Sequence, residues 1–192
     1  MVIAATIGSL SAAAPASEPS GAIDISQSAV TVHVFKTGLF RTFGDNHDIR
    51  GTVKSGFIKT TAPIQANLVV DAADLRVLDA DASVNDREQI RVRMLGPEVL
   101  DAGRFRDIRF ESTSAERTES GAWIVRGALT LHGQTHALVT LITEDQGHYK
   151  GAMTLRQTDY GITPISVAGG VVKVKDELKI DFDIVTKGTT TH

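Results

Sequence analysis

Alternation of apolar and polar residues with a period of two dominates the sequence from residue 21 onward. In the stretch AVTVHVF, Val30, Val32 and Val34 fall on one face, with Thr31 and His33 between them. The same alternation is found in IQANLVV (64–70), DIRFES (107–112), GVVKVKD (170–176) and KIDFDIV (179–185). Successive side chains of a strand point to opposite faces, so this pattern predicts half-buried antiparallel strands with one apolar face and one face in water.

Turn-forming residues separate these segments at short intervals, in ESGA (119–122), EDQGHYKG (144–151) and AGG (168–170). We expect about eight strands, near 28–36, 48–60, 64–71, 107–116, 122–132, 136–143, 148–158 and 171–186. Regular short strands separated by turns are typical of a β-sandwich or a β-barrel.

One segment, SVNDREQIRVRMLGPEVL (83–100), breaks the alternation. Ser83 and Asp86 stand at capping-box spacing, with Asp in place of the usual Glu or Gln, and no helix breaker follows until Gly96. Ile90 and Met94 lie one helical turn apart. The segment therefore predicts a helix of about three turns over 84–95, inserted between the third and fourth strands.

The composition favours one folded domain and excludes several functional classes. The chain has 192 residues, 42% of them hydrophobic, which is enough to bury a core. A net charge of −3 with mixed signs argues against a nucleic-acid partner. The absence of cysteine excludes disulfides, thiolate metal sites and a cysteine nucleophile.

The first seventeen residues, MVIAATIGSLSAAAPAS, carry no charge. The stretch ends in Ala14-Pro15-Ala16, a small-x-small pattern that precedes signal-peptide cleavage, although the usual basic residues before the apolar stretch are missing. We expect residues 1–17 to be a signal-peptide remnant or a disordered terminus, and 22–187 to form one domain. No later stretch reaches the ~18 apolar residues of a membrane span, so we expect no stable membrane insertion.

Two histidines, His132 and His136, lie four residues apart in GALTLHGQTHALVTL (127–141). Strands on both sides exclude the helical zinc motif, so their relation depends on the turn between them. A three-residue loop over 133–135 matches the apolar faces and leaves both histidines opposite each other on the outer surface. This register pairs Leu131 with Ala137, Leu129 with Val139 and Gly127 with Leu141, and turns Leu138 and Ile142 outward. Without a third ligand, we expect no functional metal site.

His47 lies in GLFRTFGDNHDIRG (38–51), beside Asp45, Asn46 and Asp48. It either recognises a ligand head group at a barrel mouth, acts as a base held by a carboxylate, or is only a loop histidine among turn-forming residues. No nucleophile elbow, P-loop or dinucleotide fingerprint occurs in the chain.

Three stretches, in order along the chain, carry a resemblance to a known family. They are FGDNHDIRG (43–51), GPEVLDAGRFRDIRFEST (96–113), and the C-terminal half with GALTLHGQTHALVTL (127–141) and QTDYGITPISVAGGVVKVKDELKIDFDI (157–184). The chain resembles the YceI-like family, bacterial envelope proteins with a lipocalin-like barrel that bind polyisoprenoid lipids. The resemblance covers about residues 22–187. It implies a mainly β fold, an eight-stranded antiparallel lipocalin-like β-barrel with one inserted helix, and a periplasmic or secreted location. The oligomeric state, monomer or homodimer, stays open, because such a barrel is complete alone or able to pair.

The chain departs from the family at two points. Many members have Arg-Ser-Asp-Phe-Gly where this chain has QTDYG (157–161), so Gln157 replaces the family's Arg and Arg156 stands beside it. Some relatives place a second His at the position of Asp45. The residues that we expect at a head-group site or entrance are Asn46, His47, Arg156 and Asp159.

The sequence is compatible with two classes of function, carrier and enzyme, and with a third, purely interactive role. The first, which we favour, is non-enzymatic carriage of a long apolar isoprenoid-type lipid, polyprenyl or quinone-like, without a cofactor. An eight-stranded barrel is just wide enough to be filled by side chains or to hold one such ligand. The second is a lipid-acting hydrolase or isomerase that uses His47 with Asp45 or Asp48. The third is a solid barrel with a purely interactive role.

Under the carrier hypothesis, the inward residues of the strands form an apolar lumen that suits a hydrocarbon chain. The residues that we expect to line it are Val32, Val34, Phe43, Val53, Phe57, Ala66, Leu68, Val70, Phe110, Leu129, Leu131, Val139, Leu141 and Leu155.

Overall fold

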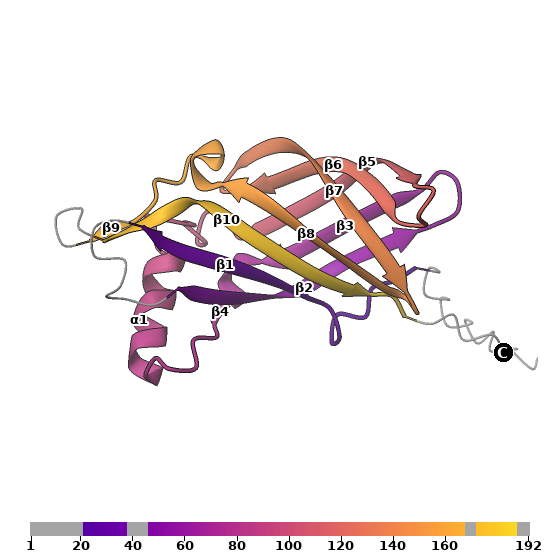
Figure 1. Ribbon diagram of the computed structural model, residues 1–192. Helices are drawn as coiled ribbons and strands as arrows, with labels where there is room; N and C mark the ends of the chain where they lie inside the picture. Colours follow the sequence, from indigo (N-terminus) through magenta and orange to yellow (C-terminus); the bar gives the residue numbers. More distant parts are fainter. Residues whose placement is uncertain (1–20, 38–45, 168–171, 188–192) are drawn as a thin grey trace, which may run out of the picture.

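The computed structural model describes residues 21–37, 46–167 and 172–187. Within these residues, eight long antiparallel strands form a closed barrel (Figure 1). They are β1 (Ala29–Thr37), β2 (His47–Lys59), β3 (Gln65–Asp71), β5 (Asp107–Arg117), β6 (Trp123–Leu131), β7 (Gln134–Asp145), β8 (His148–Arg156) and β10 (Val172–Val185). The barrel closes because β1 pairs with both β2 and β10. The predicted fold class is therefore confirmed.

Short elements complete the barrel. The two-residue strand β4 (Arg76–Val77) extends the sheet beside β2, and β9 (Ser166–Val167) pairs with β10. Two 3₁₀ helices, η1 (Ala72–Asp74) and η2 (Gln157–Tyr160), follow β3 and β8. The helix η2 is the reason that β8 ends at Arg156 rather than near residue 158.

The inserted helix α1 (Val84–Leu95) has the predicted bounds. The Ser83 hydroxyl oxygen accepts a hydrogen bond from the Asp86 backbone N–H at 3.1 Å, which satisfies one of the free donors of the first turn. Its hydroxyl also donates to the Asp86 carboxylate at 2.7 Å. Met94, on the inner side of the helix, packs into a buried cluster with Ile49 and Leu75. Figure 1 shows α1 beside the end of the barrel where β1 ends and β2 begins.

The β6–β7 turn differs from the expected three-residue loop. Leu131 pairs with Gln134, so His132 and Gly133 alone form the turn. Both have positive φ values, 50° and 74°, as a type I′ hairpin turn requires. The predicted pairing of Leu131 with Ala137 is therefore wrong, because β7 is shifted by three residues relative to it.

This shift reverses the expected orientation of β7. Val139 and Leu141, expected in the lumen, are 61% and 55% exposed on the outer face. Leu138 packs against the inner cluster of Leu129 and Leu131, and Ile142 lines the interior, although both were expected outside. The alternation in β7 is ambiguous because apolar residues occur at both phases, so only the turn decides which set faces inward.

A β-bulge in β2 changes the phase of that strand. Val53 pairs with Val70 and Ser55 with Val69, so β2 contains one additional residue at this point. Before the bulge Val53 faces inward and is 3% exposed. The additional residue changes the phase of the strand, so that Ile58 faces inward beyond the bulge. The expected inward position of Phe57 is wrong for this reason.

Candidate functional site

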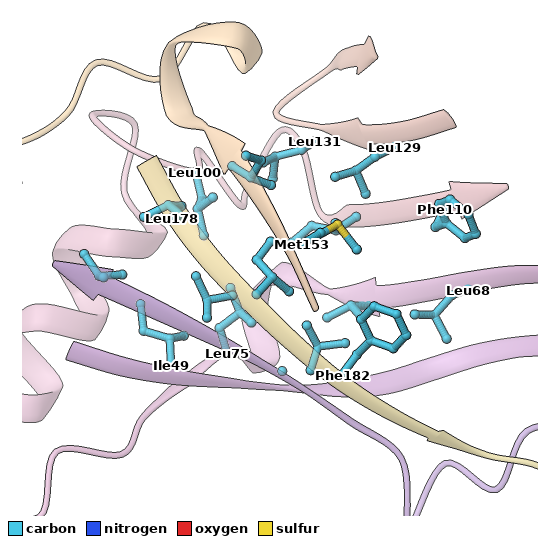
Figure 2. Close-up of a pocket in the computed structure, with 18 of the residues that line it drawn as sticks. Ile49, Leu68, Leu75, Leu100, Phe110, Leu129, Leu131, Met153, Leu178 and Phe182 are labelled. Atoms are coloured by element: carbon cyan, nitrogen blue, oxygen red, sulfur yellow. The ribbon is translucent and has the colours of Figure 1, made fainter. Parts of the chain in front are cut away.

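The interior of the barrel contains a cavity of about 450 Å³. This volume lies in the range of about 300–1,000 Å³ that is typical of ligand pockets. All eight long strands and α1 contribute to its wall, which is formed almost entirely by aliphatic and aromatic side chains (Figure 2). A cavity of this character is suited to a hydrocarbon chain rather than to a polar metabolite.

Many of the residues expected in the lumen line this cavity: Val32, Val34, Ala66, Leu68, Val70, Phe110, Leu129, Leu131 and Leu155. Val53 is buried in a cluster with Ile23 and Ile184 but does not line the cavity. Phe43 lies outside the described residues. The sequence reasoning missed lining residues such as Ile49, Leu75, Leu100, Met153, Leu178 and Phe182. Met153, Leu178 and Phe182 continue the period-two pattern of their strands, which is the signal that identifies them.

The wall carries few polar side chains. Asn67 and Thr140 are used by the barrel itself: the Asn67 amide oxygen accepts from the Phe57 N–H at 3.1 Å, and the Thr140 hydroxyl donates to the Ala152 carbonyl at 3.3 Å. The others include Lys36, His47 and Gln157, where β1 ends, β2 begins and β8 ends, and Arg93 on α1. Four polar side chains of the wall therefore lie at the α1 end, where the Gln157 amide donates to the Lys175 carbonyl and Arg93 donates to Glu98. Tyr149, near the start of β8, lies toward the other end.

His47 is held by a buried carboxylate. Its Nδ1 lies 2.5 Å from the Asp79 Oδ2, and the Asp79 side chain is 7% exposed. The other Asp79 oxygen accepts from the Asp48 N–H at 3.0 Å. This pair orients the imidazole at the cavity wall, with Nδ1 donating to Asp79.

The prediction that Asp48 pairs with His47 is wrong. The Asp48 carboxylate binds His33 instead, with its Oδ1 2.7 Å from the His33 Nδ1. Asp45, the other expected partner, lies outside the described residues. Asp79 is 32 residues from His47 in the chain, and the loop that follows β4 brings it there.

Asn46 is exposed, and its amide oxygen accepts from the backbone N–H of Lys36 at 3.3 Å. Arg156, also expected at the head-group site, lies on the outer face of β8. Its Nε donates to the Asp176 Oδ2 at 2.9 Å. The Thr158 backbone N–H, together with the Thr158 hydroxyl and Arg156, lowers the pKa of Asp176, while burial opposes this, so the carboxylate stays ionised. Asp159 is exposed on η2.

The two turn histidines have structural contacts. The His132 Nδ1–H donates to the Tyr160 carbonyl at 3.0 Å, and its ring packs edge-on against Phe105. The His136 ring packs edge-on against Tyr160, with ring centroids 5.0 Å apart. Within the described ranges, no three His, Asp or Glu side chains gather as a metal site. The described residues also include no helix long and apolar enough to cross a membrane.

The sequence model of the YceI-like domain matches residues 22–186. The chain belongs to the YceI-like family. The match extends from the isolated bridge residue Ala22, through every described strand, to Thr186. No curated protein sequence matches this YceI-like domain.

Solved structures share the barrel at low sequence identity. BcnA of Burkholderia cenocepacia is 15% identical, with a TM-score of 0.62 over 86% of this chain and 99% of its own. A polyisoprenoid binding domain from Saccharophagus degradans is 13% identical, with a TM-score of 0.62 over 88% and 98%. The YceI protein of Campylobacter jejuni is 11% identical, with a TM-score of 0.53 over 72% and 84%. At these identities the likeness shows the fold alone.

Proposed function

We propose that this YceI-like domain binds and carries a long isoprenoid-type lipid inside the barrel, without chemical conversion of the lipid. The observation that carries the proposal is the apolar cavity enclosed by all eight long strands. Each buried CH₂ group of a ligand contributes about 0.8 kcal/mol, so an isoprenoid tail needs few polar contacts to bind tightly. The polyisoprenoid binding domain of Saccharophagus degradans, which shares the fold, supports the same class of ligand.

The lipid tail contacts side chains along the cavity rather than one binding spot. In this proposal the inward residues expected from the sequence, among them Val34, Leu68 and Phe110, form the tail site. Asn46 and His47 stand near the end of the cavity that meets the head group. The protein acts in the bacterial envelope, in the periplasm or as a secreted protein. The apolar stretch 1–17, which lies outside the described residues, is its export signal.

Lipid extraction tests the proposal directly. Protein purified from the native envelope is heated and extracted with organic solvent, and the extract is analysed by mass spectrometry. We expect a stoichiometric lipid with a long isoprenoid chain. Repeated recovery of intact protein without any lipid counts against the carrier function.

One observation favours a second candidate, a lipid-acting hydrolase or isomerase. The His47–Asp79 pair at the cavity wall has the arrangement of a general base oriented by a carboxylate. The variant His47→Ala separates the two functions. A carrier retains its lipid content in this variant, whereas an enzyme loses turnover of a lipid substrate that the unmodified protein converts.

A further inference from the structure

Lys36 interrupts the apolar face of β1. Val30, Val32 and Val34 precede it at every second position, and all four residues line the cavity. Lys36 lies opposite Val174 of β10, after an irregularity in the pairing that follows Val34. The alternation places the lysine side chain on the inner wall at the α1 end, where an aliphatic residue is expected.

The ammonium nitrogen of Lys36 is shielded from solvent and has no hydrogen-bond partner among the described residues. Transfer of an ammonium group from water into an apolar interior is strongly unfavourable unless an opposite charge or several acceptors meet it. The backbone N–H of Lys36 is already bonded to Asn46, so only the side chain lacks a partner.

The described wall of the cavity offers this ammonium no carboxylate. The ionisable side chains that share its end of the cavity are His47 and Arg93, which are basic. The nearby carboxylate of Asp79 is engaged by His47 and by the Asp48 N–H. Glu98 is bound by Arg93 at 3.3 Å. Among the described residues, no side chain of the cavity therefore supplies the missing negative charge.

We propose that the lipid carried in the barrel has an acidic head group, a carboxylate or a phosphate, whose oxygen binds the Lys36 ammonium. The inference rests on the proposed carrier function and specifies the ligand class. The head lies at the α1 end, and the tail extends toward Phe110 and Leu68, which Figure 2 shows further from α1 than Ile49. A charge-assisted hydrogen bond of this kind is stronger than one between neutral groups.

The test uses three probes with the same isoprenoid tail: farnesol, farnesoic acid and farnesyl phosphate. Calorimetry measures their Kd values on delipidated protein. We expect at least one acidic probe to bind the unmodified protein at least tenfold more tightly than farnesol does. Whichever acid binds more tightly distinguishes a carboxylate head from a phosphate head.

Four variants assign this preference to Lys36. Lys36→Met and Lys36→Gln are expected to remove the preference for the acids while farnesol still binds, and Lys36→Arg is expected to retain it. Lys173→Met is the matched control, because Lys173 is an exposed lysine beside the same strand pair, opposite Thr37. It should leave all three affinities unchanged.

Two outcomes overturn the inference alone, and a third overturns the carrier function as well. Equal binding of all three probes to the unmodified protein indicates a neutral ligand, such as a quinone or an alcohol, and leaves the carrier function intact. Retention of the acid preference in both Lys36→Met and Lys36→Gln assigns the preference to another residue. If none of the probes binds the unmodified protein, the carrier function itself fails together with the inference.

Discussion

The ring of Phe182 lies directly over Gly151, its cross-strand partner on β8. A Cβ atom on Gly151 would stand 2.5 Å from the Phe182 Cζ and 2.8 Å from the carbonyl oxygen of Leu141. The Phe110 ring approaches Gly127 as closely, although Gly127 pairs with Ser112: the Phe110 Cε2 would lie 2.4 Å from a Cβ on Gly127. Glycine within a strand often marks such a close approach. Here it lets two cavity-lining rings lie flat against the wall and keeps the centre of the barrel open.

Replacement of Gly151 with alanine should disturb both the wall and the cavity. The new methyl group forces the Phe182 ring toward the interior and strains the β7–β8 pair, which we expect to cost about 1–3 kcal/mol of unfolding free energy. Lipid binding should weaken as well. Urea denaturation of Gly151→Ala and of the control Gly103→Ala, whose new Cβ meets no atom within 4 Å, checks this. Equal stability of the two variants would contradict the packing described for Phe182.

A bulky residue at Ala66 tests whether the barrel is hollow in solution. Ala66 lines the cavity on β3, so Ala66→Phe places a ring in the path of a lipid tail. We expect lipid binding to fall while the melting temperature is retained, because the ring buries apolar area in open space. In a solid core the same change would cost about 1–3 kcal/mol.

The control for this variant is Gln65→Phe, since Gln65 is exposed on the neighbouring position of β3. It should affect neither lipid content nor melting temperature. A clear loss of stability in Ala66→Phe with native lipid content retained would instead indicate a barrel filled by its own side chains.

His33 links three strands on the outer face through two carboxylates. Its Nδ1 lies 2.7 Å from Asp48 of β2 and its Nε2 2.8 Å from Asp181 of β10. The hydrogen bond to Asp48 raises the pKa of His33 above 6.5, with burial opposing and Asp181 adding to the shift. Because the pKa of His33 is raised in the folded state, protonated His33 contributes its full stabilisation below about pH 6.5. This contribution is lost as the pH rises through the folded-state pKa of His33.

A double-mutant cycle measures this contribution. We expect His33→Gln and Asp48→Asn to show a coupling energy of about 1 kcal/mol or less at pH 5.5, the range of partly exposed ion pairs. The coupling should decline at pH 9, where the imidazole is neutral. Chemical denaturation of the four proteins at both pH values provides the energies, and a coupling that increases with pH would be inconsistent with an imidazolium between two carboxylates.

The β6–β7 turn depends on Gly133. Its φ of 74° is one that a residue with a Cβ rarely adopts, and a Cβ there would also lie 2.6 Å from the Phe105 ring. We expect Gly133→Ala to cost more than about 1 kcal/mol of unfolding free energy. Gly121→Ala is the matched control, because Gly121 has a φ of 86° but no neighbour within 4 Å of the added Cβ. The difference between the two variants isolates the ring contact, and a smaller loss at Gly133 than at Gly121 would exclude it.

The sequence by itself determined the local elements of this protein. Period-two alternation together with turn-forming residues identified the eight long strands, and the capping pair Ser83 and Asp86 with the helix breaker at Gly96 identified the bounds of α1. These features depend on neighbours within a few positions, where side-chain direction and hydrogen bonding to the backbone decide the outcome. The closed barrel and its apolar interior followed from the pattern together with the family resemblance.

Only the tertiary structure decided how these elements meet. A two-residue turn at His132 set the register that places Val139 and Leu141 outside, and one additional residue in β2 turned Phe57 away from the cavity. The pairing of His47 with Asp79 joins residues that no local pattern relates. For the two strands the physical reason is the same. A shift of one residue in register exchanges the two faces of a strand at almost no local cost, so only packing across the whole barrel selects one arrangement.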